Sequence, residues 1–132
     1  MKLTDLAILD WVLINNTPHK IQAIDSIDAE ILADDELYYI GEDRYHSEDT
    51  VEGVPLTPEI LEKNGFIKVN SQRYDYGYPD TDCYVKVNPK KNMIHVNGRN
   101  ANSNLYSHSF VHELQRALRL CGLNELADNF KV

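Results

Sequence analysis

Alternating apolar and polar residues near the start of the chain predict a small antiparallel sheet. The turn-forming residues Asn15-Asn16-Thr17-Pro18 separate two apolar-rich runs, which predicts a hairpin. Two further short runs follow, and Gly41 ends the second of them. We expect a curled, SH3-like meander and then a polar loop over residues 42–53. The four predicted strands are residues 8–14, 19–24, 27–32 and 37–40.

Residues 55–66 predict a helix of about two turns. Thr57 can cap its start, Pro58 fits its first turn, and Gly65 can adopt the left-handed conformation after its end. A second antiparallel meander is expected after this helix, and the Asn-rich residues 98–104 are expected to form an exposed loop. The predicted strands of this meander are residues 66–69, 73–76, 83–87 and 93–96.

The C-terminal part of the chain has the spacing of an amphipathic helix over about residues 107–121, with Gly122 as its stop. We expect its apolar side to pack on the second sheet. That apolar side contains Phe110, Leu114, Ala117, Leu118 and Cys121. Another side carries polar residues at intervals of four, four and three. These residues are His108, His112, Arg116 and Arg119.

Together these elements predict an α+β protein. Its 132 residues suffice for one domain with an ordinary core, in which residues 1–41 and 54–132 form two sub-structures. Cys83 and Cys121 are too few and too far apart for a disulfide framework, so we expect free thiols in a reducing compartment. Because we find neither a signal peptide nor a membrane-length apolar run, we expect a cytoplasmic protein.

Charge is distributed unevenly along the chain. Residues 1–66 have a balance of −11 and residues 67–132 a balance of +3, for a total of −8. The acidic first half disfavours nucleic-acid binding. It is either a solvated surface or a surface that binds a protein partner, and a divalent-cation site is disfavoured because the calcium-loop spacing is missing. The candidate acidic residues are Asp34, Asp35, Glu36, Glu42 and Asp43.

The pair His112-Glu113 resembles half of a zinc-hydrolase helix. In the H-E-x-x-H pattern two histidines four residues apart bind zinc and the glutamate polarises its water. Here the second position is Arg116, whose guanidinium has no lone pair to donate. We therefore predict no metal and no cofactor at this segment, and an ion pair between Glu113 and Arg116.

Three tyrosines at alternate positions, Tyr74, Tyr76 and Tyr78, lie near Arg73 and Lys86 in the sequence. Such residues can stack on a ligand, although strand tyrosines more often serve packing. The chain lacks phosphate-loop, dinucleotide and serine-elbow motifs. A ligand-binding hypothesis therefore combines the helix and the tyrosine strand. Its residues are His108, His112, Glu113, Arg116, Arg119, Tyr74 and Tyr76.

Two segments carry a resemblance to known proteins. Residues 55–66 (PLTPEILEKNGF) and residues 111–115 (VHELQ) resemble small uncharacterised proteins of prophages and mobile elements in gut bacteria. Members of that group can have a His where this chain has Arg116. The resemblance implies a phage accessory context and no reaction.

The sequence thus favours a non-enzymatic accessory protein that binds a protein partner. The alternative is a binder of a small anionic ligand or nucleotide, or a degenerate hydrolase, that uses the residues of the C-terminal helix.

Overall fold

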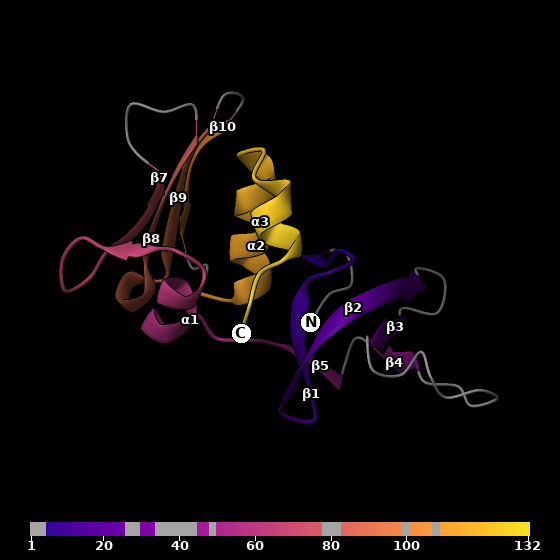
Figure 1. Ribbon diagram of the computed structural model, residues 1–132. Helices are drawn as coiled ribbons and strands as arrows, with labels where there is room; N and C mark the ends of the chain where they lie inside the picture. Colours follow the sequence, from indigo (N-terminus) through magenta and orange to yellow (C-terminus); the bar gives the residue numbers. More distant parts are fainter. Residues whose placement is uncertain are drawn as a thin grey trace. The chain divides into compact units, whose positions relative to one another are not determined.

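The computed structural model describes residues 5–25, 30–33, 45–47, 50–77, 83–98, 101–106 and 109–132. These residues form two antiparallel sheets and three short α-helices, which confirms the α+β class (Figure 1). Residues 1–54 and residues 55–132 each form a compact unit. Among the described residues, none of the helices has the length and apolar content needed to cross a bilayer.

The first unit contains a sheet with the strand order β4-β3-β2-β1-β5. The predicted hairpin is confirmed: β1 and β2 pair through a two-residue turn at Asn15 and Asn16, which both have positive φ. The core of this unit is made of Val12, Ile14, Ile21, Ile31 and Val51. The strands are β1 (Trp11–Ile14), β2 (Thr17–Asp25), β3 (Glu30–Ala33), β4 (Tyr45–Ser47) and β5 (Val51–Gly53).

The prediction of a loop over residues 42–53 was wrong for part of that segment. Both β4 and β5 lie within it, at the two edges of the sheet. Val51 is buried in the core and pairs with Ile14, so pairing and burial outweigh the polar composition around it. The strand predicted at residues 37–40 lies outside the described residues.

The short helix α1 (Pro58–Lys63) begins the second unit as predicted. The Thr57 Oγ1 atom accepts a hydrogen bond from the Ile60 N–H at 3.2 Å, which caps the helix start. Gly65 has φ of 86°, and the Phe66 N–H donates to the Leu61 carbonyl oxygen at 3.0 Å. Gly65 is therefore the left-handed residue that ends the helix.

The second unit contains a sheet with the strand order β10-β9-β8-β7-β6. The loop predicted over residues 98–104 was wrong, because β10 pairs with β9 along its whole length. Ladder hydrogen bonds here outweigh the poor strand preference of Asn. The strands are β6 (Ile67–Lys68), β7 (Tyr74–Gly77), β8 (Cys83–Asn88), β9 (Met93–Gly98) and β10 (Ala101–Tyr106).

Two helices, α2 (Val111–Leu120) and α3 (Asn124–Asp128), follow and lie along one face of this sheet (Figure 1). We call the face that they cover the inner face and the opposite one the outer face. Alternating strand residues point to the inner face and are almost fully buried. These residues include Val85, Val87, Ile94 and Val96.

The helix α2 begins at Val111, four residues later than predicted, and its buried side differs from the predicted one. Leu114, Ala117 and Leu118 are buried as expected. Phe110 is instead the N-cap residue, and 37% of it is exposed. Cys121 lies at the C-cap and is only half-buried. The helix α3 was not predicted, because its five residues are too few to show a helical pattern.

Candidate binding face

The hydrolase-like residues of α2 serve the fold. His112 is only 5% exposed and its ring stacks on Phe110, with 5.8 Å between the ring centroids. The Glu113 carboxylate accepts hydrogen bonds from the Ser109 and Phe110 N–H groups, both at 3.2 Å. Glu113 therefore satisfies backbone donors at the start of α2, as the glutamate of a capping box does.

The remaining residues of the predicted polar side point elsewhere. Arg116 is exposed and forms no ion pair with another described residue, so the predicted pair with Glu113 is not formed. Arg119 donates from Nη2 to the Asp128 carboxylate of α3 at 3.3 Å. His108 and Tyr78 lie outside the described residues.

Tyr74 and Tyr76 do share a face of β7, but it is the inner face. Tyr74 is buried, and the Tyr76 ring packs against Phe66 with 5.4 Å between centroids. Tyr76 also lines an open cavity of about 480 Å³ together with Leu123 and Leu126 near α3. Neither tyrosine therefore presents its ring on the outer face.

The structure does not bring the predicted ligand residues together in one described site. The acidic candidates Asp34, Asp35, Glu36, Glu42 and Asp43 lie outside the described residues. In the part of the chain that the structure describes, no three His, Cys, Asp or Glu side chains form a group that could hold a metal ion.

A different set of polar residues converges on the outer face, around Asp75. The Arg73 guanidinium donates from Nε and Nη2 to the two carboxylate oxygens of Asp75, both at 2.9 Å. The Tyr84 hydroxyl donates to Asp75 Oδ2 at 2.7 Å. This bidentate geometry fixes the plane of the guanidinium and uses its Nε edge.

Burial and Asp75 both affect the titration of this cluster. Burial of the phenol, and then its hydrogen bond to Asp75, raise the pKa of Tyr84 from 10.0 to about 12. The hydrogen bond to Asp75 also raises the pKa of Arg73 above its ordinary value. The cluster therefore holds a neutral phenol and a charged guanidinium across the physiological pH range.

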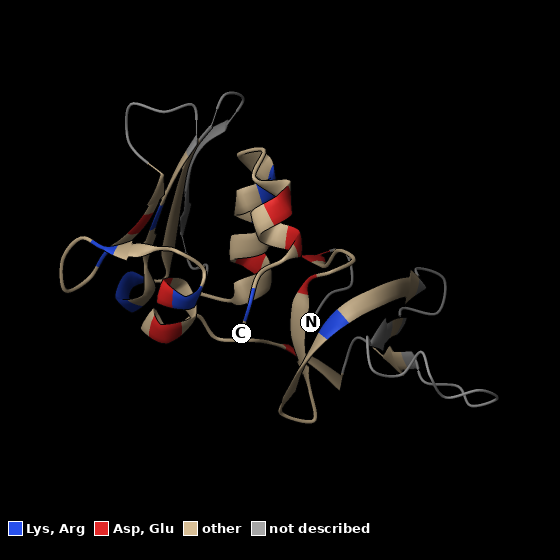
Figure 2. Cartoon of the chain, in the orientation of Figure 1, with Lys and Arg blue, Asp and Glu red and all other residues tan. Residues whose placement is uncertain are grey.

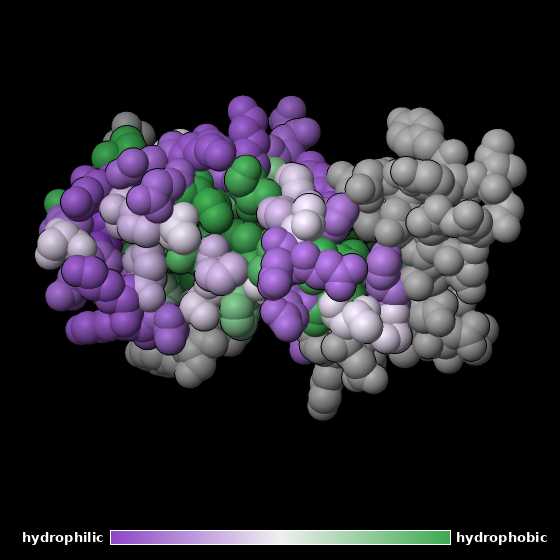
Figure 3. Space-filling view, turned by 90° about the horizontal axis from the view of Figure 1, so that it is seen from below, coloured by the Kyte–Doolittle hydropathy of each residue, from purple (hydrophilic) through white to green (hydrophobic). Residues whose placement is uncertain are grey.

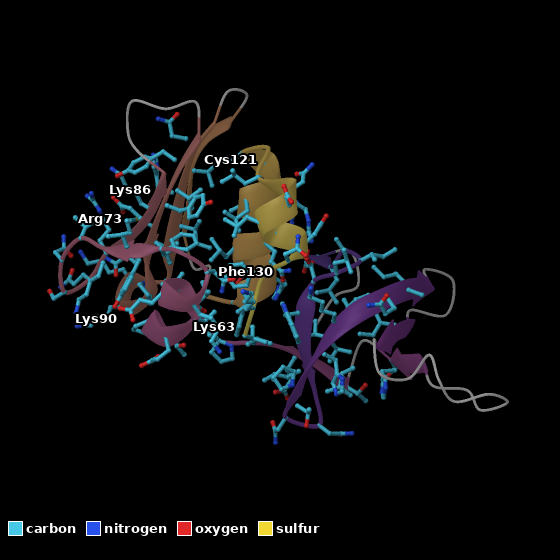
Figure 4. The ribbon with its side chains drawn as sticks, in the orientation of Figure 1. Lys63, Arg73, Lys86, Lys90, Cys121 and Phe130 are labelled. Carbon is cyan, nitrogen blue, oxygen red and sulfur yellow. The ribbon has the colours of Figure 1, made fainter. Side chains whose placement is uncertain are left out.

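Lys86 adds a second positive charge beside this cluster. It lies directly across from Asp75 in the β7–β8 register, and its ammonium is 5.2 Å from the centre of the Tyr84 ring. Such cation–π contacts favour the charged form over an aromatic face. Arg73 and Lys86 both project from the side of the sheet that faces away from α2 (Figure 4). Two cations thus flank a single carboxylate.

Two exposed aliphatic residues lie next to these cations. Ile67 is 63% exposed and pairs with Asp75, while Val69 is 50% exposed and donates its N–H to the Arg73 carbonyl oxygen. Cross-strand neighbours share a face of a sheet, so both side chains lie on the outer face. We define the outer-face patch as Ile67, Val69, Arg73 and Lys86.

The surroundings of the patch are mostly polar and basic. Among the described residues from 67 to 98, Asp75 is the one acidic residue, and Figure 2 shows basic positions in blue along this sheet. The basic residues are Lys68, Arg73, Lys86, Lys90 and Lys91. In Figure 3 hydrophilic residues cover most of the visible described surface, and hydrophobic residues form only small areas. Two adjacent exposed aliphatic side chains in such a setting make the outer-face patch the candidate interaction surface of this unit.

The sequence spacing contains a partial signal for this cluster. Arg73 and Asp75 are two apart, as are Tyr84 and Lys86, so each pair shares one face of its predicted strand. The register that brings the two pairs together depends on residues 77–83 and could not be read from the pattern. Comparison of the chain with known protein families, curated proteins and solved structures finds no match.

Proposed function

We propose that this chain is a non-enzymatic binding protein that engages an acidic segment of a partner protein through the outer-face patch. The observation that carries the proposal is the position of two exposed aliphatic side chains beside two cations on one sheet face. Interfaces between proteins combine apolar contacts in this way with charged groups around them.

The aliphatic residues supply the apolar contact. Fully burying an exposed Val or Ile is worth about 1.5–3 kcal/mol, and Ile67 and Val69 retain half or more of that surface. Because Ile67 belongs to an edge strand and Val69 follows that strand, a partner can reach both residues without displacing any described strand of the sheet. Their exposure is therefore usable binding surface.

The cations select the partner. Asp75 engages the Nε and Nη2 groups of Arg73, which leaves Nη1 to donate to an incoming carboxylate. The Lys86 ammonium contacts a neutral ring and forms no ion pair with another described residue. An acidic protein segment complements both groups, and this complementarity favours encounter and specificity.

A protein partner fits better than a nucleic acid. Tyr84, the described aromatic residue of this cluster, is buried and bonded to Asp75, so its ring is not open to a base. The alternative of a small anionic ligand on α2 has less support, because His112 is buried and Glu113 caps the helix.

The resemblance to prophage and mobile-element proteins gives the proposal a setting. In that setting the chain is an accessory protein of the cytoplasm, and its partner is a host or phage protein. A second binding surface in the acidic first half remains a separate prediction from the sequence.

Differential capture tests the proposal. The wild-type chain, the variant Ile67→Ser/Val69→Ser and the control Leu120→Ser are immobilised and exposed to a gut-bacterial lysate. Leu120 is 52% exposed on α2 of the same unit, so the control removes an exposed apolar side chain away from the patch. We expect a protein with an acidic segment to be retained by wild type and Leu120→Ser and lost by the double variant. Equal retention by all three chains would contradict the proposal.

A further inference from the structure

We infer that the acidic partner segment binds as an added β-strand along the free edge of β6. This inference rests on the proposed function and specifies how the partner binds. The strand order places β6 at one edge of the second sheet, next to β7. Edge strands present unpaired backbone groups that can accept a further strand.

The register determines which backbone groups face that edge. The Val69 N–H donates to the Arg73 carbonyl oxygen at 2.9 Å, so Val69 directs its backbone groups toward β7. Hydrogen-bonding direction alternates along a strand, and Lys68 pairs with Tyr74 at the next position. The N–H and carbonyl groups of Lys68 therefore point away from the sheet, toward the position of an added strand.

Neighbouring segments limit the length of the added strand. On one side the Phe66 N–H is bonded to the Leu61 carbonyl oxygen at the end of α1. On the other side the chain bends over residues 70–72. The edge thus suits an occupant of about three residues centred on Lys68, at one residue per ~3.3 Å.

The side chains around this edge specify the order of those residues. The side chain of Lys68 is exposed and lies on the face opposite to Ile67 and Val69. An acidic residue of the occupant can pair with Lys68, and apolar residues on either side of it can contact Ile67 and Val69 on the outer face. The preferred strand therefore alternates apolar, acidic and apolar residues, and the carboxylates that meet Arg73 and Lys86 belong to the part of the partner outside this strand.

Charge also argues that the occupant is a different protein and not a second copy of this edge. Two copies paired through β6 would bring the two Lys68 ammonium groups close together, and lysine on an edge strand opposes such self-pairing. An acidic residue on the added strand would instead attract the Lys68 ammonium.

The first test uses capped peptides and the full-length chain. The probe is Glu-Val-Glu-Val-Glu, acetylated and amidated, and the matched control is Val-Val-Glu-Glu-Glu, which has the same composition and charge without the alternation. In nuclear magnetic resonance titrations we expect the alternating peptide to slow hydrogen exchange at the Lys68 amide. Equal effects of the two peptides, or protection of Lys68 by raising the protein concentration alone, would overturn the inference.

The second test separates the contribution of the Lys68 backbone N–H to peptide binding from that of the Lys68 charge. Lys68→Pro removes the outward N–H, which β7 does not use, and the preceding residue Ile67 already lies in a strand, as proline requires. Lys68→Ala removes the charge and keeps the N–H. We expect Lys68→Pro to bind the alternating peptide about ten-fold more weakly than Lys68→Ala does.

The outcomes distinguish the two proposals. If Ile67→Ser/Val69→Ser loses peptide binding but Lys68→Pro and Lys68→Ala bind equally, the added strand is wrong and the outer-face patch stands. If wild type and the double variant give the same response to the peptide, the proposed function itself is wrong. Unchanged exchange at the Val69 amide of Lys68→Pro shows that its β6–β7 ladder is intact.

Discussion

The two faces of the second sheet contain polar groups that are used in different ways. On the helix-covered side the buried Gln115 donates from Nε2 to the Ala127 carbonyl oxygen at 2.9 Å, and thereby holds α3 against α2. On the outer face Asp75 holds Arg73 and Tyr84 at the surface, next to exposed Ile67 and Val69. The first arrangement joins two helices, whereas the second joins two strands and also holds a guanidinium at the surface.

A second buried amide near the helices also connects parts of the fold. The buried amide of Asn64 donates to the Lys131 carbonyl oxygen at 2.7 Å and accepts from the Lys131 N–H at 2.8 Å. This pairing fastens the C-terminal residues to α1 and satisfies both amide groups. Polar side chains next to the helices of this unit therefore connect parts of the fold, whereas on the outer face we propose that they take part in recognition.

The largest expected loss of stability comes from a substitution in the core between α2 and the sheet. Leu118→Ala should lower the free energy of unfolding by about 2–5 kcal/mol, because it removes a fully buried side chain and leaves a cavity. Ile67→Ser on the outer face should change it by less than about 0.5 kcal/mol. Urea denaturation followed by circular dichroism measures both, and equal losses would remove the distinction between the faces.

A smaller effect is expected for the amide that joins α2 and α3. Gln115→Ala should cost about 1–3 kcal/mol, since it removes a fully buried side chain and the Ala127 carbonyl oxygen keeps only the longer bond from the Phe130 N–H at 3.4 Å. Arg116→Ala, at the neighbouring exposed position, is the matched control and should cost less than about 0.5 kcal/mol. The same denaturation experiment applies, and a Gln115→Ala variant as stable as its control would show that the bond contributes little.

Alkaline titration of the Tyr84 phenol tests its burial and its hydrogen bond to Asp75. The folded-state pKa of Tyr84 is raised from 10.0 to about 12, so its stabilising contribution is fully present below pH 10 and is lost as the pH rises through about 12. The difference in phenolate absorbance between wild type and Tyr84→Phe should therefore develop near pH 12. Asp75→Asn should shift that midpoint toward 10, because it removes the charged acceptor. A Tyr84 midpoint at 10 in the wild type would contradict the buried, bonded phenol.

The smallest expected effect concerns the hydrolase-like pattern. Arg116→His completes H-E-x-x-H in the sequence and should change stability by less than about 0.5 kcal/mol, because Arg116 is exposed. We expect no stoichiometric zinc after dialysis, measured by elemental analysis of untagged protein. The reason is that His112 is buried against Phe110 and the Glu113 carboxylate caps α2. One bound zinc per chain would show that these residues rearrange easily.

Local sequence patterns predicted the elements with strong signals. Thr57, Pro58 and Gly65 defined α1, and Asn15 and Asn16 defined the first hairpin. Elements whose stability comes from pairing were missed, because nothing within β5 or β10 distinguishes a short polar strand from a loop. These two strands form because of their pairing with distant residues, which the local sequence does not specify.

The candidate site was less predictable than the fold. The His-Glu pair attracted attention as a motif, but whether it faces a cleft or the core depends on where α2 starts and what covers it. The cluster around Asp75 needs the β7–β8 register, which a sequence pattern specifies only when both strand ends are known. Edge position, which makes Ile67 and Val69 accessible, is a property of the whole sheet.

The most direct measurement is a titration of the isotope-labelled full-length chain with the Glu-Val-Glu-Val-Glu peptide, in which every assigned amide is followed. We predict that the largest shifts fall on β6 and on Val69, and that α2 and β1 stay unchanged. Shifts concentrated on α2 around Arg116, or on β1 and β2, would contradict this prediction.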